Sequence, residues 1–340
     1  MLAVLYQTKL RRDGRLVSQV RVSVGTGVVL GLWKGQLMVA PTTAYLLTYY
    51  PGRCRANCKF CPQARNSMSD VNMLSRVVWP KCEVDLVLEA LREHQGRLKR
   101  VCIQAINYPE VIDELCELVA RIKSFCDLPI SISCQPLTGA DIKRLVGAGV
   151  ERISIALDAA TPEVFDRVKG REVSGPYEWR TQMKALDEAR AMHGDRVSTH
   201  LMVGLGETEE DMVRTIQLLH DKGIVVGLFA FTPISGTPLA KQARPNVPSY
   251  HRIQLASYLI RQGLTDVGGI TFKDGRITDF RVSREVLRRT VDSGEPFRTS
   301  GCQGCNRPFY NESPRGPIYN YPQKLKPREI AMIQDQLGVN

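Results

Sequence analysis

The stretch AYLLTYYPGRCRANCKFC, residues 44–61, joins a run of apolar residues to a short loop that carries three cysteines. The run 44–50 has the length and composition of a buried strand. Pro51 and Gly52 follow it and mark the start of a turn. The loop 51–65 therefore follows the carboxyl end of a predicted strand and brings its three thiols close together in the chain.

The three cysteines are Cys54, Cys58 and Cys61, in the spacing C-x3-C-x2-C, with Phe60 directly before the last of them. Thiolates are the usual ligands of iron–sulfur clusters. Three thiolates leave the fourth iron of a [4Fe–4S] cluster open, as a catalytic metal requires. The alternative is a zinc site, but zinc would need a fourth ligand that this loop does not supply. The spacing favours the cluster.

Downstream of the loop, strand-like runs alternate with segments of helical periodicity. The predicted strands are 44–50, 100–105, 129–134, 151–157, 197–205 and 225–231. The predicted helices are 84–93, 111–125, 141–146, 177–192 and 209–222. Such alternation predicts an α/β fold with a parallel sheet and right-handed crossovers. Six strands indicate a partial (β/α)6 TIM-type barrel, whose chemistry lies at the carboxyl ends of the strands.

Two extensions flank this barrel core, which we place at residues 41–240. Residues 1–40 alternate apolar runs with turn signals at 12–14 and 33–35 and predict an N-terminal β-hairpin. Residues 241–340 predict a C-terminal helical and hairpin extension, with a helix at 249–262 and a hairpin around Asp274-Gly275. The extension includes a tail, 293–326, that is rich in Gly, Pro, Asn and aromatic residues.

The composition sets limits on compartment and partners. The chain has 340 residues, no apolar run long enough to span a membrane and no N-terminal secretory pattern, so we expect a cytoplasmic protein without membrane contact. We expect its 10 cysteines to be reduced, as core residues or metal ligands. The net charge of +11 favours an acidic partner: nucleic acid, an anionic cofactor or an acidic protein.

A second group of cysteines predicts another metal site. Cys102 and Cys134 lie near the ends of the second and third predicted strands, where both thiols could face one cavity. Cys302 and Cys305 form a C-x2-C pair in a glycine-rich loop, a chelating unit that needs two further ligands. Together the four predict an auxiliary cluster inside the barrel. Alternatively, the strand cysteines are core residues and the tail pair forms a small structural site. The remaining cysteines, which we expect in the core, are Cys82, Cys116 and Cys126.

The cysteine loop resembles the signature of the radical S-adenosylmethionine (SAM) superfamily. The resemblance implies that SAM chelates the open iron and, once reduced, yields a 5′-deoxyadenosyl radical that abstracts an unactivated hydrogen. Residues 203–208 resemble the adenine-contacting strand of the family, and Asp158 resembles its ribose-binding carboxylate; the alternative for Asp158 is a helix N-cap. The family's Gly-Gly-Glu stretch is replaced here by residues 105–109, whose backbone would contact the SAM ammonium. The residues implied in cofactor binding are Phe60, Asn107, Asp158, Gly204, Gly206 and Glu207.

Residues 44–240 also resemble biotin synthase, notably in the stretches 102–109, 197–208 and 236–239. The resemblance implies sulfur-cluster cysteines on the second and third strands. Biotin synthase has a further cluster cysteine on the fifth strand, where this chain has Ser198, and it lacks the C-terminal C-x2-C. The set of ligands and the substrate are therefore expected to differ.

The tail 299–322, TSGCQGCNRPFYNESPRGPIYNYP, resembles that of the split, two-component lipoyl synthases. The resemblance implies sulfur insertion into an octanoyl chain on a lysine of an acidic carrier protein, with sulfur from the auxiliary cluster. It also implies a second radical SAM subunit and an electron donor such as ferredoxin or flavodoxin. It further suggests Ser300 as an iron ligand, since ordinary lipoyl synthase uses a related serine.

The sequence is also compatible with other functions. The chain would be another sulfur-inserting radical SAM enzyme if it acted on a free small molecule, as biotin synthase does, or on tRNA. A tRNA-thiolating enzyme would carry an RNA-binding domain, and we find none of the familiar signatures, so nucleic acid is not the expected partner. A non-catalytic zinc scaffold is the alternative from a different class.

Overall fold

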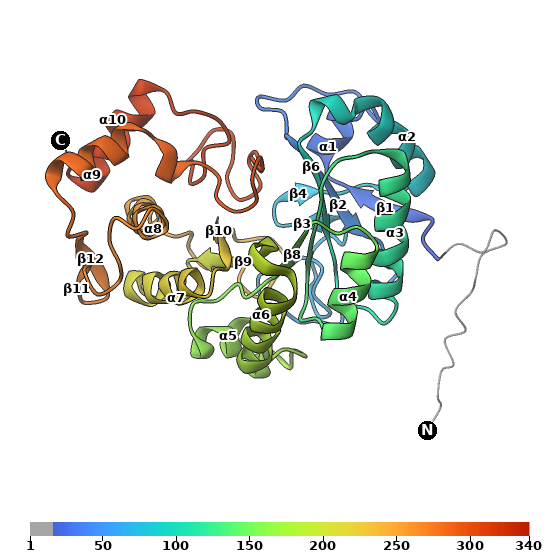
Figure 1. Ribbon diagram of the computed structural model, residues 1–340, viewed down its shortest axis with the longest axis horizontal. Helices are drawn as coiled ribbons and strands as arrows, with labels where there is room; N and C mark the ends of the chain where they lie inside the picture. Colours follow the sequence, from blue (N-terminus) through green and yellow to red (C-terminus); the bar gives the residue numbers. More distant parts are fainter. Residues whose placement is uncertain (1–15, 340) are drawn as a thin grey trace.

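The computed structural model describes residues 16–339 (Figure 1). Its centre is an eight-stranded sheet with the order β10-β9-β8-β7-β6-β2-β1-β5. The six strands from β10 to β2 are parallel and hydrogen-bonded to their neighbours. These strands are β2 (Thr43–Thr48), β6 (Arg100–Gln104), β7 (Ile130–Cys134), β8 (Arg152–Ile155), β9 (Val197–Val203) and β10 (Val225–Ala230). They lie where the sequence predicts them, in a mixed α/β fold built on a partial TIM-type barrel.

Helices connect the parallel strands as right-handed crossovers require. In Figure 1, α2 to α4 cover one flank of the sheet, and α5 to α7 lie toward β9 and β10. Two of these helices begin with complete capping boxes, Thr138 with Asp141 and Thr208 with Asp211, which satisfy otherwise unpaired N–H groups. The connecting helices are α2 (Val84–His94), α3 (Val111–Phe125), α4 (Gly139–Gly147), α5 (Pro162–Val168), α6 (Trp179–His193) and α7 (Glu209–Asp221).

The described part of the N-terminal extension differs from the predicted hairpin. It contains one strand, β1 (Gln19–Val22), and a short helix, α1 (Val24–Val29). β1 pairs with β2 on one side and with β5 (Lys81–Glu83) on the other, both antiparallel. Its partners thus come from later in the chain. The predicted turn at residues 12–14 lies outside the described residues.

The C-terminal extension packs around α8 (Val247–Arg261), which lies against α7 (Figure 1). Arg252 and Glu209 form a buried ion pair between these helices, and Glu209 also accepts a hydrogen bond from the Ile277 N–H at 2.9 Å. The predicted hairpin around Asp274 is present. The other elements of the extension are β11 (Thr271–Lys273), β12 (Arg276–Asp279), α9 (Arg284–Asp292) and α10 (Pro327–Leu337). The remaining elements are a two-stranded ribbon and four short 3-10 turns. The ribbon consists of β3 (Met73–Leu74) and β4 (Val77–Val78), and the turns are η1 (Gln95–Arg97), η2 (Arg171–Val173), η3 (Gly194–Arg196) and η4 (Glu295–Phe297).

The tail links the first and last barrel strands. On the β10 side, the Leu228 N–H donates to Ser300 Oγ at 2.8 Å, and Arg307 donates to the Leu228 carbonyl at 3.3 Å. On the β2 side, the Thr42 N–H donates to Asn306 Oδ1 at 3.0 Å, and its hydroxyl donates to the Gly304 carbonyl at 2.7 Å. These bonds place the C-x2-C loop inside the barrel, between the strands that end the parallel sheet.

Strand alternation decides which side chains face the interior of the barrel. On β6, Val101 and Ile103 are fully buried in the core, whereas Cys102 and Gln104 line an interior cavity. On β10, Gly227 and Phe229 face the same way, and a Cβ on Gly227 would lie 3.7 Å from the Gly301 Cα. The glycines at this contact let the tail come close to the strand.

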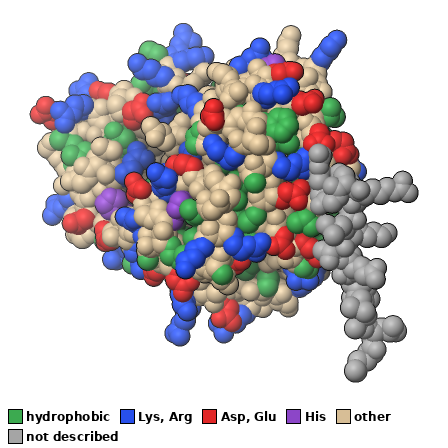
Figure 2. Space-filling view, turned by 45° about the vertical axis from the view of Figure 1, so that its right-hand side comes forward, with side chains coloured by type: hydrophobic (Ala, Val, Ile, Leu, Met, Phe, Trp, Pro, Cys, Tyr) green, Lys and Arg blue, Asp and Glu red, His purple; other side chains and the backbone are tan. Residues whose placement is uncertain are grey.

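The surface bears charges of both signs. On the face drawn in Figure 2, Lys and Arg side chains are interspersed with Asp and Glu and form no continuous stripe. Among the described helices, none combines the length and apolarity needed to cross a bilayer.

Candidate functional site: two groups of thiols in one cavity

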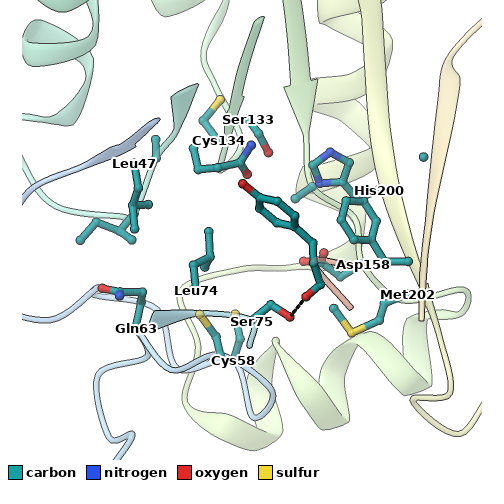
Figure 3. A pocket seen from close by; sticks show the side chains of 18 of the residues that line it. Leu47, Cys58, Gln63, Leu74, Ser75, Ser133, Cys134, Asp158, His200 and Met202 are labelled. Atoms are coloured by element: carbon teal, nitrogen blue, oxygen red, sulfur yellow. Dashed lines mark hydrogen bonds between the residues drawn. The ribbon is translucent and has the colours of Figure 1, made fainter. Parts of the chain in front are cut away.

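One cavity of about 270 Å³ occupies the interior of the barrel. Figure 3 shows Cys58 at one end of it and Ser133 and Cys134 at the other, with Asp158, His200 and Met202 along one wall. Both groups of thiols predicted as metal ligands contribute to its lining, and these are Cys54, Cys58, Cys61, Cys102, Cys134, Cys302 and Cys305. None of the cysteines is in a disulfide.

Backbone hydrogen bonds hold the first loop at the carboxyl ends of the strands. The Cys54 N–H donates to the Gln63 carbonyl at 3.1 Å, and the Cys61 N–H donates to the Cys58 carbonyl at 3.1 Å. Asn107, which follows β6, donates its N–H to the Cys54 sulfur at 3.1 Å and accepts from the Arg55 N–H at 2.8 Å. The turn after the second barrel strand is therefore bonded directly to the cysteine loop.

Burial makes free thiolates unfavourable in this loop. It raises the pKa of Cys61 to about 12, with the neighbouring Cys54 as the next cause, and it raises the pKa of Cys58 well above its usual value. The ammonium of Lys169 opposes the rise at Cys58. Bound iron would supply the positive charge that three thiolates need here.

The surroundings of these thiols suit a cluster better than a single metal ion. Within residues 16–339, no three His, Cys, Asp or Glu side chains are grouped tightly enough to surround one ion. Thiolates of a [4Fe–4S] cube bind different irons and stand farther apart than the ligands of a single zinc. The three buried thiols and the open cavity beside them therefore suit a cube.

Asp158 faces the cavity from the end of β8 and pairs with Lys169. The Lys169 ammonium donates to Asp158 Oδ2 at 2.6 Å and to the Ala156 carbonyl, and both side chains are largely buried. Asp158 has a φ of 66°, in the left-handed region. It is not a helix N-cap: Thr161 caps α5, accepting from the Val164 N–H at 3.2 Å. Its carboxylate is thus available to the cavity.

Of the predicted cofactor contacts, Phe60, Asn107 and Asp158 line the cavity, whereas Gly204, Gly206 and Glu207 do not. These three form a tight turn after β9. The Glu207 carboxylate accepts from the Gly204 N–H at 2.6 Å and from the Leu205 N–H at 3.0 Å. Both glycines have positive φ, 104° and 114°. Their role in contacting SAM stays a prediction.

The second group brings Cys102 together with the tail pair. The nearby Cys302 and Cys305 sulfurs are, after burial, the largest causes that raise the pKa of Cys102. The Tyr45 hydroxyl lies 3.2 Å from the Cys305 sulfur and accepts from the Arg307 N–H at 2.9 Å. Gln104 donates to the Cys102 sulfur at 3.1 Å. Three thiols with surrounding donors fit a cluster ligated through Cys102, Cys302 and Cys305.

The structure does not bring Cys134 to this group. On β7, Cys134 shares a face with the core residues Ile130 and Ile132, and its sulfur lies 3.7 Å from the Ser154 carbonyl. Its pKa, raised by burial to about 12, has Asp141 rather than a tail cysteine as its next cause. Cys134 ends β7 and lines the cavity there, but in the sheet register Ser131, and not Cys134, stands opposite Cys102.

Serines occupy the inward positions instead. Ser131 pairs with Cys102 in the sheet, and its hydroxyl lies 3.9 Å from the Cys302 sulfur. Ser198 lines the cavity with a buried hydroxyl that has no hydrogen-bond partner. Ser300, suggested by resemblance, accepts from the Leu228 N–H. A serine hydroxyl, that of Ser131, therefore lies beside one thiol of the tail pair.

Sequence reasoning missed several residues of the cavity. His200 packs its ring against Phe229 with centroids 4.9 Å apart, and burial lowers its pKa to about 4, so it is neutral at pH 7. Arg307 lies with its guanidinium carbon 3.8 Å from the centre of the Phe229 ring. In the motif GCQGCNRP, only the two cysteines were predicted to have a role, but Arg307 of the same motif also lines the cavity.

A partial parallel barrel whose first strand ends in three convergent thiols defines a class of iron–sulfur enzymes that generate radicals. The chain belongs to the radical SAM superfamily, whose family model matches residues 49–219. Membership implies a [4Fe–4S] cluster and SAM as cofactors.

Relatives within this superfamily include biotin synthases. The chain is 26% identical over 265 residues to biotin synthase of Clostridium botulinum (strain Hall), covering 74% of this chain and 77% of the relative. It is 22% identical over 268 residues to biotin synthase of Synechococcus sp. (strain WH7803), with the same coverage.

Two solved structures illustrate the likeness of the fold. One is the FeFe-hydrogenase maturase HydG from Carboxydothermus hydrogenoformans, with a TM-score of 0.51, 17% identity, and coverage of 74% of this chain and 66% of that one. The other is methylornithine synthase (PylB), with a TM-score of 0.51, 16% identity, and coverage of 70% and 66%. At this identity the likeness concerns the fold.

Proposed function

We propose that this radical SAM enzyme is a sulfurtransferase that inserts sulfur into the octanoyl-lysyl chain of a lipoyl carrier protein. The observation that carries the proposal is the shared cavity, lined by Cys54, Cys58 and Cys61 and also by Cys102, Cys302 and Cys305. Such an arrangement suits a reaction in which a radical formed at one end meets sulfur stored at the other. The resemblance of the tail to split lipoyl synthases supports the lipoyl substrate.

The lining between the two groups of thiols suits an alkyl chain. Side chains of Leu47, Leu74, Ile106, Met202 and Phe229 contribute apolar surface to the cavity. An octanoyl chain buried there would lose contact with water, which stabilises its binding by about 0.8 kcal/mol per methylene. An alkyl radical reacts with whatever lies nearest, so this lining would also hold the chain in place.

The cofactors would supply the difficult chemistry: SAM at the first cluster a hydrogen-abstracting radical, and the auxiliary cluster the sulfur. The chain's own residues would position the reactants. Asp158, held by Lys169, would bind a hydroxyl-bearing part of SAM, and Asn107 ties the adjoining turn to the cysteine loop. The tail, bonded to both β2 and β10, would cover the end of the acyl cavity that lies away from the first cysteine loop.

Three partners belong to the proposal: an acidic octanoylated carrier, a second radical SAM subunit, and a one-electron donor such as ferredoxin or flavodoxin. The net charge of +11 supports an acidic carrier and an acidic donor. The second insertion would occur on this chain or on the partner subunit.

A second candidate is sulfur insertion into a free small molecule in the manner of biotin synthase. The relatives named biotin synthase favour it, since they match 74% of this chain. Against it stand Ser198 on the fifth barrel strand and the C-x2-C pair in the tail, where the resemblance to biotin synthase ends.

Two measurements test the proposal. Anaerobically purified protein should contain about eight irons per chain, and the Cys302→Ala/Cys305→Ala variant about four, with SAM cleavage to 5′-deoxyadenosine retained. Mass spectrometry of an octanoyl-lysyl peptide, after turnover with SAM and reductant, should show added sulfur with the parent chain and none with the variant. Candidate partner subunits are added in parallel reactions.

Each contrary result has a distinct meaning. A chain that binds zinc and no iron would overturn the enzyme assignment. Four irons in the parent chain would remove the auxiliary cluster. Sulfur added to dethiobiotin, and none to the octanoyl-lysyl peptide with any partner, would favour the second candidate.

A further inference from the structure

A second cavity, of about 300 Å³, lies on the other side of the tail loop. Its walls include Thr42 and Lys99, which directly precede β2 and β6, and Ser257, Tyr258 and Arg261 of α8. Since Thr42 and Lys99 precede parallel strands, this cavity lies at the amino-terminal mouth of the barrel. The cysteine loop of residues 54–61 lies at the opposite, carboxyl-terminal mouth.

The two cavities share a thin wall. Ser300, Gly301, Cys302 and Cys305 line both of them. Gly301 and Gly304 have φ values of 111° and 77°, a conformation that favours glycine, and a Cβ on Gly304 would collide with the Lys99 stem at 2.9 Å. Backbone without side chains thus forms part of this wall, and the tail thiols of Cys302 and Cys305 line the second cavity directly.

The chemistry of the second cavity differs from that of the first. Its lining is rich in hydroxyl, amide and charged groups, including Lys99 and Arg261, whose side chains are exposed. Its acidic residue Glu295 is paired with Arg298 at 2.8 Å. A polar cavity with a surplus of positive charge attracts a small hydrated anion and offers nothing to an acyl chain.

We propose that the second cavity admits hydrosulfide from the solvent to Cys302 and Cys305, separately from the route taken by SAM and the acyl substrate. The purpose of this route rests on the proposed function: sulfur leaves with the product, so a sulfur-supplying reaction must follow each turnover. Hydrosulfide is a small anion that binds iron without a change of oxidation state. A route through the amino-terminal mouth leaves the substrate cavity undisturbed.

Alkylation of the iron-free, reduced full chain tests the route. Sodium iodoacetate serves as the anionic probe and iodoacetamide as the neutral probe of the same shape, and mass spectrometry gives the rate at each cysteine. Ser257→Trp fills the second cavity and should slow labelling of Cys302 and Cys305 by about tenfold. Cys54, Cys58 and Cys61, which line only the first cavity, are internal controls and should keep their rates.

Charge is tested by a second variant that needs no bulky side chain. Lys99→Glu should lower the ratio of iodoacetate to iodoacetamide rates at Cys302 and Cys305 by about threefold to tenfold at low salt, because a nearby charge changes sign. Arg180→Glu, at an exposed position on α6, is the matched control and should leave this ratio unchanged. Added sodium sulfide should protect Cys302 and Cys305 from iodoacetate in the ferrous-iron-loaded parent chain more than in Lys99→Glu.

The proposal is overturned if folded Ser257→Trp is labelled at Cys302 and Cys305 at the parental rate. It is equally overturned if Lys99→Glu and Arg180→Glu show the same rate ratio. These readouts need neither SAM nor substrate. A failure here therefore leaves sulfur insertion to its own assay, and a failure of sulfur insertion leaves the measured access route in place.

Discussion

Asp158 and Lys169 form the one charged pair described in the wall of the cavity beside the first cysteine loop. Lys169 is buried, so its ammonium holds the carboxylate in one orientation and also lies close to Cys54 and Cys58. A carboxylate held in one orientation matters for binding an organic cofactor. It matters less for holding iron, because the thiols bind the iron.

We predict that Lys169→Met lowers the affinity of the iron-loaded protein for SAM by about tenfold to hundredfold, because Asp158 loses its partner and is left partly buried. The iron content should stay at the parental value. Titration calorimetry with SAM measures the affinity, and Lys184→Met, which removes an exposed ammonium from α6, is the control. Loss of iron in Lys169→Met would show instead that the lysine stabilises the cluster loop.

Glu312 in the tail is a buried carboxyl that accepts from the Asn320 N–H at 3.0 Å. Burial raises its pKa to about 7. The pKa of Glu312 is therefore higher in the folded protein than in the unfolded one. Its contribution to the free energy of unfolding is fully present below the unfolded pKa, and it is lost as pH rises through about 7.

Glu312→Gln, which keeps an acceptor and removes the titration, should therefore gain stability relative to the parent by about 1–3 kcal/mol between pH 5 and pH 8. Urea unfolding of both iron-free proteins at the two pH values measures the difference. His200 and His251, whose pKa values burial lowers to about 4, are present in both chains and cancel in the comparison. A difference that is independent of pH would refute the assignment.

Among the predicted ligands, the first three cysteines need less structural information to be grouped than the second set does. The spacing of Cys54, Cys58 and Cys61 lies within one loop, so local chain geometry suffices to bring the thiols together. The second site depends on strand parity and on a tail far away in sequence. The sheet register places Ser131 rather than Cys134 opposite Cys102, and this does not follow from residue type alone.

Among the elements, the loop that carries the cysteines continues to residues 67–69, which pack against the turn after β10. A Cβ on Gly236, at a φ of 81°, would lie 2.5 Å from the Ser69 nitrogen, and the Gly236 carbonyl accepts from the Met68 N–H at 2.8 Å. This contact fixes the far end of the cysteine loop to the sixth barrel strand.

Gly236→Ala should therefore lower the free energy of unfolding by about 2–4 kcal/mol, through left-handed strain together with a backbone collision. Gly263→Ala is the matched control, because Gly263 has a φ of 64° but nothing within 4 Å of its added Cβ. It should cost only about 1–2 kcal/mol. Equal losses in urea unfolding would mean that the Ser69 contact is not tight.

The periodic elements of the barrel could be predicted because their apolar pattern repeats over many residues. α3 spans Val111–Phe125, as predicted, and the six parallel strands are displaced by no more than a few residues. Helices α1, α9 and α10 were not predicted as separate elements. α1 has the sequence VGTGVV, which favours a strand by composition, and it is a helix because Ser23 caps it and three of its residues are buried.

For the whole molecule, the buried pair of Arg252 and Glu209 joins the C-terminal extension to α7 of the barrel. Removing one charge leaves the other buried and unpaired, so Arg252→Met should cost about 3–5 kcal/mol. Arg214→Met, which removes an exposed partner of Glu210, should cost less than about 1 kcal/mol. Urea unfolding measures both.

A double variant, Arg252→Met with Glu209→Gln, separates the pair from packing. It should recover part of the loss, since no unpaired charge then remains. If the double variant loses the sum of the two single losses, the two side chains stabilise the junction through their packing alone.

The tail that joins β10 to β2 also sets an order of events during synthesis. Ribosomes deliver the chain from its amino end, so residues 54–61 and the strands around them emerge well before Cys302 and Cys305 do. Until residues 299–306 have emerged, Cys102 lacks the tail thiols beside it. A nascent barrel can thus acquire its first metal centre before Cys302 and Cys305 are made, whereas the proposed auxiliary cluster would have to wait for them.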